Sequence, residues 1–295
     1  MKKRKKKNAS DIILDSIIYL VLIALVVVTI YPVWYVIVAS FSTSTALAKV
    51  EGLLFWPPDF NLEGYRLVAT NKLLLSGLKN SFIVLFGSLP FNLLLTLLCG
   101  YFLAMPGLFW KKPISFYILF TMYFSGGMIP TYLNVKGLGL SDTLWALIIP
   151  GALSVYNAII CKSAIEGVPD SLREAAYIDG ANDFYILFKV IMPLIKPTLA
   201  VLTLYYGVSH WNSWYTASLY ILDEMKLPVQ NIIRNILIVN DSSLTGTGAM
   251  DDNYSTFAES IKYAAIVVTT APVMCIYPFV QKYFTKGVMI GAVKG

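Results

Sequence analysis

The sequence predicts an all-α integral membrane protein with six transmembrane helices, and three observations lead to this fold class. Of the 295 residues, 57% are hydrophobic and only 14% are charged, whereas an ordinary soluble domain carries about 25% charged residues. Six runs contain no Asp, Glu, Lys or Arg, and each approaches or exceeds the roughly 20 residues that a helix needs to cross a bilayer. The Lys and Arg residues are distributed unevenly between these runs. Together these observations exclude a soluble globular protein.

The six charge-free runs are each expected to cross the membrane once. They occupy 16–48, 80–110, 113–135, 143–161, 197–222 and 263–281. The apolar part of the first run continues to about Phe41 and is too long for a cleaved signal peptide. Proline residues within the runs, such as Pro32 and Pro90, are compatible with membrane helices, because neighbouring helices satisfy the backbone groups that a break frees.

The positions of Lys and Arg predict the orientation, because positive charge in short loops stays on the cytoplasmic side. With both termini inside, the inner segments hold 15 of the 23 basic residues, including the cluster at 2–7. We therefore expect a multi-pass protein of the cell membrane with cytoplasmic N- and C-termini. The basic tail 1–11 is expected to anchor this topology and to meet anionic membrane lipid. No nucleic acid is expected as a partner, because that role requires a basic face on a soluble module.

One transmembrane domain is predicted over 1–295, and two of its connecting segments, 42–79 and 223–262, are expected on the external side. The sequence Phe-Trp-Pro-Pro at 55–58 predicts an ordered loop on the membrane surface. The stretch 240–253 is rich in Ser, Thr, Gly and Asp and predicts an exposed loop.

A third long segment, 164–197, is expected in the cytoplasm as a bent pair of short helices. Pro169 suits the first turn of a helix, and Ser171 with Glu174 three residues later predicts a capping box. Gly180 can adopt the left-handed conformation that ends this first helix.

The second helix of the pair is expected to begin at Asn182 or Asp183 and to run to Pro193. The pair also carries apolar residues, although the segment is too charged to enter lipid. These residues are Leu172, Ala175, Ala176 and Phe184. Such a surface indicates a protein partner.

The same segment resembles the EAA loop of the membrane subunits of binding-protein-dependent ABC importers. The resemblance is carried by Glu174-Ala175-Ala176, Asp179-Gly180-Ala181, Phe188, Val190, Met192-Pro193 and Pro197. The family form is EAAxxDGA followed by Ile-x-Leu-Pro, and Val190 and Met192 replace that Ile and Leu with residues of similar apolar bulk. The resemblance implies a type I ABC importer (MetI-like) permease fold, in which this loop forms coupling helices that sit in a groove of a cytoplasmic ATPase.

Further motifs resemble the carbohydrate branch of these permeases. They are Phe55-Trp-Pro-Pro58, Leu62-Glu-Gly-Tyr65, Asn80-Ser81, Tyr101-Phe-Leu-Ala104, Leu227-Pro-Val-Gln230 and the C-terminal stretch 281–295. The stretch Phe124-Ser-Gly-Gly-Met-Ile-Pro-Thr-Tyr132, with Leu138-Gly-Leu140 and Leu144-Trp-Ala146, is similar to the subgroup of LplC and YtcP. That subgroup is associated with complex saccharides, including oligosaccharides released from polysaccharides.

The resemblance implies a transport subunit rather than an enzyme. The chain has no GxxxxGK[ST] phosphate loop, so it lacks that device for holding a nucleotide. The implied partners are two ATPase subunits that bind ATP and Mg²⁺, a second homologous permease chain, and an extracytoplasmic, lipid-anchored saccharide-binding protein. No cofactor is expected on this chain, and ATP-driven alternating access is the implied mechanism. The residues expected to couple to the ATPase are Leu172, Glu174, Ala175, Ala176, Asp179, Gly180 and Phe184.

Candidates for a substrate pathway lie in the fourth and fifth runs. Aromatic rings can stack on sugar rings, while amides and hydroxyls bond sugar hydroxyls. Residues of this kind are Tyr156 and Asn157, and then Tyr205, Tyr206, His210, Trp211, Asn212, Ser213, Trp214 and Tyr215. Of these, Tyr156, Asn157, Tyr206, His210, Trp211, Asn212 and Tyr215 are the predicted pathway residues. An interfacial aromatic belt or ordinary helix packing remains an alternative explanation for each.

Other functional classes fit the sequence less well. An ion-coupled secondary transporter normally carries charged residues within its spans, and the six runs contain none. A membrane enzyme would need paired acids, an activated nucleophile or metal ligands, yet the chain has a single His and three isolated Cys residues. A permease for a non-sugar solute remains an alternative within the family.

Overall fold

The computed structural model describes residues 9–107, 109–244, 261–276 and 278, and their regular structure is helical apart from one isolated bridge between Ser42 and Phe60. The chain forms two compact units. The first comprises Met1–Thr70 with Ile236–Val268, and the second comprises Asn71–Asn235 with Thr269–Gly295.

The first unit contains helix α1, Ala9–Ser40, followed by the short helices α2, Ser44–Leu47, and α3, Glu63–Thr70. The apolar side chains of α1 from Ile12 to Ile30 are exposed on all faces of the helix, as in a helix whose neighbours are lipid or another chain. Val38 and Ala39 near its end are buried. The predicted loop at 55–58 is held to α1, because Trp34 Nε1 donates to the Phe55 carbonyl oxygen at 3.1 Å.

The second unit is organised around the 33-residue helix α4, Lys72–Ala104. Asn71 caps its N-terminus by accepting hydrogen bonds from the backbone N–H groups of Leu73 and Leu74. Part of the segment 42–79 that was expected as a loop is therefore helical.

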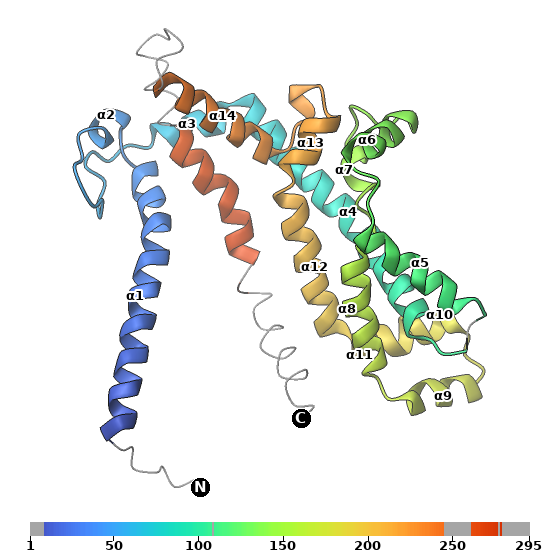
Figure 1. Ribbon diagram of the computed structural model, residues 1–295. Coiled ribbons are helices and arrows are strands. Elements are labelled where there is room, and N and C mark those ends of the chain that lie inside the picture. Colours follow the sequence, from blue (N-terminus) through green and yellow to red (C-terminus); the bar gives the residue numbers. More distant parts are fainter. Residues whose placement is uncertain (1–8, 108, 245–260, 277, 279–295) are drawn as a thin grey trace. The chain divides into compact units, whose positions relative to one another are not determined.

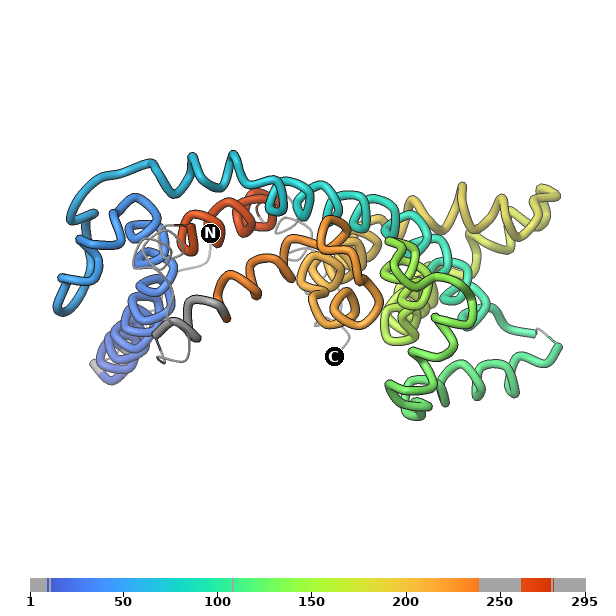
Figure 2. The backbone as a smooth tube through the Cα atoms, turned by 90° about the horizontal axis from the view of Figure 1, so that it is seen from above, coloured from blue at the N-terminus to red at the C-terminus, as the bar shows by residue number. Residues whose placement is uncertain are grey.

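Helix α4 packs against α8, Val155–Glu166, and α12, Lys196–Trp211 (Figures 1 and 2). The approach to α8 is closest at Gly100, where an added Cβ would lie 2.9 Å from the Cys161 Cβ. Small residues permit such close contact between membrane helices.

The other helices of the second unit are short. They are α5, Lys111–Tyr123; α6, Met128–Gly137; α7, Trp145–Ile148; α9, Asp170–Ile178; α10, Asp183–Tyr185; the π-helix η1, Ile186–Ile191; α11, Met192–Leu194; α13, Trp214–Tyr220; and the 3₁₀ turn η2, Glu224–Lys226.

Helix α14, Val229–Leu244, occupies much of the segment 223–262 that was expected as an external loop. Its beginning is buried because Val229 and Ile232 pack closely on Gly77 of α4. The part of the predicted exposed loop 240–253 that follows Leu244 lies outside the described residues.

Six continuous transmembrane helices are not confirmed. Among the described residues, Ile12–Ser40 and Lys72–Ala104 are long and apolar enough to span, and a third span is counted if Asp183–Leu194 and Lys196–Trp211, bent by 86°, form one broken helix. The other runs are apolar but interrupted. Gly127, at φ 93°, precedes α6, and residues 149–154 separate α7 from α8. Hydropathy measures apolar content and does not report such breaks.

Candidate functional site

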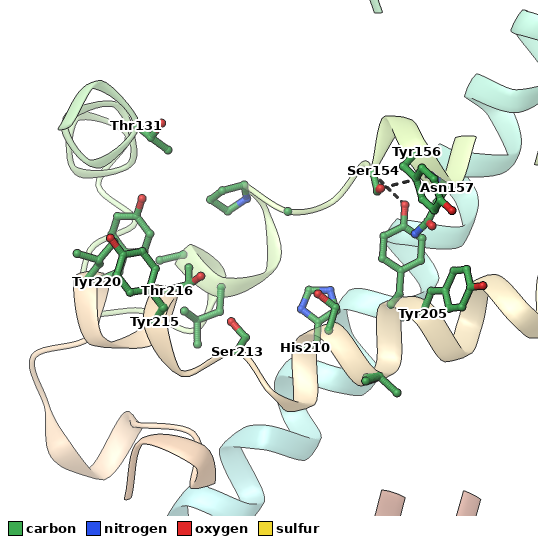
Figure 3. A pocket seen from close by; sticks show the side chains of 18 of the residues that line it. Thr131, Ser154, Tyr156, Asn157, Tyr205, His210, Ser213, Tyr215, Thr216 and Tyr220 are labelled. Carbon is green, nitrogen blue, oxygen red and sulfur yellow. Dashed lines mark hydrogen bonds between the residues drawn. The ribbon is translucent and has the colours of Figure 1, made fainter. Parts of the chain in front are cut away.

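A cavity of about 1070 Å³ lies in the second unit between α12 and α13 on one side and the segment from α6 to α8 on the other (Figure 3). Its polar lining consists of hydroxyl, phenol, amide and imidazole groups, and no Asp, Glu, Lys or Arg is found among the described residues that line it. The cavity is therefore suited to a polar, uncharged surface on a ligand.

Five of the seven predicted pathway residues line this cavity: Tyr156, Asn157, Tyr206, His210 and Tyr215. Trp211 does not line it, because its side chain is 3% exposed and packs against Phe82 with the ring centroids 5.3 Å apart. Asn212 also lies outside the lining, as the C-cap residue of α12.

The lining face of α12 follows the helical repeat. Tyr206, Ser209 and His210 are spaced at i, i+3 and i+4, which places them on one face. Ser213, the N-cap residue of α13, extends the lining beyond the end of α12. Trp211 falls on another face. The predicted pathway residues from 206 to 215 lie close together in the chain, whereas the helical spacing includes Ser209 and excludes Trp211. Thr131 and Thr216 also line the cavity and had no comparable sequence signal.

Two buried polar residues of α4 hold the wall of the cavity. The Asn92 Nδ2 group donates to the carbonyl oxygens of Gly151 at 3.0 Å and Ala152 at 2.9 Å. Its Oδ1 lies 3.1 Å from Nε2 of His210. Because the two carbonyls fix the amide orientation, Oδ1 of Asn92 is the acceptor and Nε2 of His210 is the donor in this contact.

Thr96, one turn further along α4, contacts the Tyr206 hydroxyl at 2.7 Å. That hydroxyl also accepts a hydrogen bond from the backbone N–H of Ser154 at 2.9 Å. Asn92 and Thr96 are both fully buried. These contacts satisfy backbone groups of the non-helical segment 149–154, which would be costly to leave unpaired in a membrane protein.

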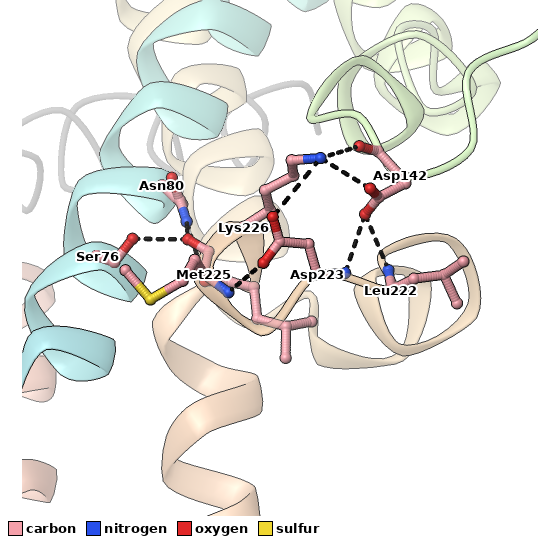
Figure 4. A network of polar contacts seen from close by, with 8 residues as sticks. Ser76, Asn80, Asp142, Leu222, Asp223, Met225 and Lys226 are labelled. Carbon is pink, nitrogen blue, oxygen red and sulfur yellow. Dashed lines mark hydrogen bonds and ion pairs between the residues drawn. The ribbon is translucent and has the colours of Figure 1, made fainter.

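A polar network ties the segment after α6 to the segment after α13 (Figure 4). Asp142 Oδ2 lies 2.7 Å from Nζ of Lys226, and Oδ1 accepts hydrogen bonds from the backbone N–H groups of Leu222 at 3.1 Å and Asp223 at 3.0 Å. The hydrogen bond from Lys226, followed by those from the backbone, lowers the pKa of Asp142 to about 2. The network thereby holds the end of α13, which contributes Tyr215 to the cavity.

The same network reaches α4. The Met225 carbonyl oxygen accepts hydrogen bonds from Ser76 Oγ at 2.6 Å and Asn80 Nδ2 at 2.8 Å. Asn80 and Ser76 lie one turn apart on α4, so the turn η2 is fastened to α4.

The predicted helix pair at 164–197 is present as α9 and the segment α10–η1–α11. Gly180 has φ 81°, and α9 ends with hydrogen bonds from Gly180 N to Tyr177 O and from Ala181 N to Ala176 O, a Schellman motif. Asn182 caps the second helix through a 2.8 Å hydrogen bond from the backbone N–H of Tyr185. Both helix-end predictions are confirmed.

The predicted capping box is wrong. Helix α9 begins at Asp170, its N-cap position is Pro169, and no side chain caps it. Ser171 therefore lies inside the first turn, where it cannot act as the N-cap with Glu174.

Most of the predicted coupling residues are accessible. Leu172, Glu174, Ala175, Asp179, Gly180 and Phe184 are exposed, whereas Ala176 is half-buried and packs against the hydrophobic core. Ile178 is 86% exposed at the end of α9, and the sequence reasoning did not include it. The structure thus supplies an additional apolar residue on the same short helix.

The arrangement defines a helical membrane protein that carries an uncharged polar cavity and an exposed pair of short helices at 164–197. The chain matches the family model described as "Binding-protein-dependent transport system inner membrane component" over residues 80–290. It belongs to this family of permeases.

Several known proteins are similar to this chain. The polygalacturonan/rhamnogalacturonan transport system permease protein YtcP of Bacillus subtilis (strain 168) is 40% identical over 281 residues, covering 95% of this chain and 98% of YtcP. Protein LplC of the same organism is 38% identical over 268 residues, covering 91% of this chain and 90% of LplC. A chain of a bacterial ABC transporter involved in the import of the acidic polysaccharide alginate superimposes with a TM-score of 0.84 at 31% identity, covering 95% of this chain and 100% of that chain.

Family membership confirms the predicted class. The chain is an integral component of the inner membrane, and it works in a binding-protein-dependent ABC transporter, which implies ATPase and binding-protein partners. It is a permease subunit and not itself catalytic, because ATP is handled by the partner subunits. An ion-coupled secondary transporter is thereby excluded.

Proposed function

We propose that this chain translocates a carbohydrate, in the form of an oligosaccharide or complex saccharide, across the cell membrane by ATP-driven alternating access. The observation that carries the proposal is the cavity, which combines Tyr side chains with hydroxyl, amide and imidazole groups and has no charged residue in its described lining. YtcP and the alginate transporter, which are similar to this chain, are described as transporting polysaccharides, and this supports a saccharide as the solute.

The chemistry of the cavity suits a sugar. Tyrosine rings offer apolar faces for the C–H surfaces of a pyranose ring, and their edges and hydroxyls remain polar. The volume of about 1070 Å³ lies at the upper end of the roughly 300–1,000 Å³ typical of small-molecule pockets, which leaves room for more than a monosaccharide. Tyr156, Tyr205 and Tyr215 line the cavity and are exposed, so their rings are available to a ligand.

Six spans and one permease domain over 1–295 are part of the proposal. The charge-free runs that contain α5 with α6, and α7 with α8, would each span as broken helices, and the helix Ile261–Ile276 would belong to the sixth span. Both termini would be cytoplasmic, as the excess of basic residues in the inner segments indicates. The basic tail before Ala9 and most of the C-terminal stretch lie outside the described residues.

A second homologous permease chain completes the proposed assembly, together with two ATPase subunits and a lipid-anchored binding protein. The apolar side chains exposed along α1 support a further membrane partner or lipid around this helix. Helix α9 and Phe184 would form the coupling surface, since apolar residues are exposed there beside Glu174 and Asp179.

The coupling assignment is tested by Glu174→Lys in the intact transporter. Uptake of the saccharide and co-purification of the ATPase should both fall, while the amount of permease in the membrane stays unchanged. Glu166→Lys is the matched control, because Glu166 lies at the end of α8 and pairs with Lys162 within that helix. Undiminished uptake in Glu174→Lys would refute the assignment.

The cavity assignment is tested by Tyr156→Ala, with uptake of neutral and uronate oligosaccharides as the measurement. Loss of an aromatic stacking partner is worth about 1 kcal/mol, so uptake at low substrate concentration should fall about fivefold. Tyr123→Ala is the control, since Tyr123 is 84% exposed and does not line the cavity. Equal uptake by both variants would remove the cavity from the substrate pathway.

A further inference from the structure

One carboxylate, that of Asp183, joins three helical elements on the side of the second unit where α4 ends. Its Oδ1 accepts a 2.9 Å hydrogen bond from the hydroxyl of Tyr101 in the last turn of α4. The same oxygen accepts a short hydrogen bond from the hydroxyl of Tyr177 on α9. Asp183 itself is the first residue of α10.

This contact is a principal polar connection between α9 and α4. The described hydrogen bonds between the α9–α10 segment and the end of α4 are those of Tyr101 with Asp183 and of Arg173 Nη1 with the Met105 sulfur, at 3.4 Å. No residue of α9 is buried. A displacement of α9 by a bound partner would therefore reach α4 through few side chains.

Tyr101 connects this contact to the core. Its side chain is 8% exposed and belongs to a buried cluster with Leu97, Ile186 and Leu202. These residues come from α4, η1 and α12. Helix α12 continues to the cavity, which His210 lines, and α4 carries Asn92, which contacts His210. Packed cores shift between discrete arrangements rather than deforming continuously, so a movement imposed at Tyr101 is carried along these helices.

The charge on Asp183 strengthens the connection. Hydrogen bonds to an ionised acceptor are shorter and stronger than neutral ones, and the hydrogen bond to Asp183 raises the pKa of Tyr177. Tyr177 and Asp183 lie on opposite sides of the Gly180 turn, so the carboxylate also fixes the angle between α9 and α10.

We propose that Asp183 is a positioning residue that transmits the movement of α9 to α4 and thereby couples ATP hydrolysis to the opening of the cavity. The inference rests on the proposed function, in which α9 docks on the ATPase. Asp183 is not assigned to the docking surface. Its substitution should change how efficiently hydrolysis drives transport and leave ATPase binding intact.

The experiment uses the assembled transporter in proteoliposomes with its saccharide-loaded binding protein. It measures co-purification of the ATPase, ATP hydrolysis, and saccharide transported per ATP. In Asp183→Ala the ATPase should co-purify normally, but transport per ATP should fall at least tenfold, because losing the Tyr101 hydrogen bond to a charged group alone corresponds to about that factor. Tyr101→Phe should have a similar effect, because it removes the α4 side of the same connection.

Two further variants separate positioning from a general structural role. Asp183→Asn retains an amide oxygen that can accept from both phenols but lacks the charge, so it should recover part of the lost coupling. Asp170→Ala is the matched control, since it removes the same charge from the same segment but its ion pair with Arg173, at 2.8 Å, stays within α9.

If the Asp183→Ala transporter moves as much saccharide per ATP as the wild type, the proposal is overturned. A parallel loss of ATPase binding, hydrolysis and transport would also overturn it, because Asp183 would then only maintain the loop. The proposed function fails separately if Glu174→Lys retains uptake and ATPase binding, whatever the coupling ratio of the Asp183 variants.

Discussion

Asn92 offers the sharpest test of how the cavity wall is held. The side chain is fully buried on α4, donates to the carbonyl oxygens of Gly151 and Ala152, and contacts Nε2 of His210. Replacing Asn92 by Ala removes all three contacts and leaves two backbone carbonyls and the imidazole without this partner.

The expected loss of stability follows from the three hydrogen bonds. Interhelical hydrogen bonds in membrane proteins contribute about 0.6 kcal/mol each on average and at most about 1.7 kcal/mol. Three bonds of average strength amount to about 2 kcal/mol for Asn92→Ala. The loss should be at least this large, because the freed carbonyls lie in a non-helical segment.

The measurement is reversible unfolding of the purified permease in mixed micelles, with uptake measured in parallel. Ser88→Ala is the matched control, because Ser88 is equally buried one turn earlier on α4 but bonds only the Leu85 carbonyl of its own helix. If Asn92→Ala is no less stable than Ser88→Ala, the hydrogen bonds do not hold the segment 149–154.

Three further substitutions have defined outcomes. Gly100→Ala places a Cβ 2.9 Å from Cys161, so overpacking should destabilise the permease by about 1–3 kcal/mol in the same unfolding assay; an unchanged midpoint would contradict the close helix contact. Gly180→Ala puts a side chain at φ 81° and should cost about 1–2 kcal/mol, seen as weaker ATPase co-purification, with Gly180→Asn affected less. Because Lys226 lowers the pKa of Asp142 to about 2, the stability due to this ionised carboxylate is present above about pH 4 and is lost as pH falls through about 2. The decrease of the unfolding midpoint on acidification should therefore be smaller in Asp142→Asn than in the wild type. The same decrease in both proteins would argue against the pairing.

Local signals in the sequence were sufficient for the turn between α9 and α10. A glycine that requires a left-handed conformation and an asparagine that caps the next helix act within a few residues, so Gly180 and Asn182 could be placed from the sequence alone. The start of α9 was less well defined, because Pro169, Asp170 and Ser171 are all acceptable near a helix N-terminus.

Contacts between distant parts of the chain had no comparable signal. Asp142 and Lys226 are 84 residues apart, and neither lies in a motif that predicts a partner. The same holds for Asn92 with His210, where the polar residue could have bonded any neighbouring helix. The breaks within apolar runs were also missed, since composition alone does not distinguish a continuous helix from two short ones.

The contact between Gly100 and Cys161 has a practical consequence for spectroscopy on this permease. Cys161 is fully buried against α4, whereas Cys99 is half-buried and Cys275 is exposed. Thiol-reactive labels will therefore reach Cys161 last. A labelling background needs substitutions at Cys275 and Cys99, while Cys161 can remain in place. Probes introduced on α9 and at the end of α4 could then report the distance between the two helices during the transport cycle.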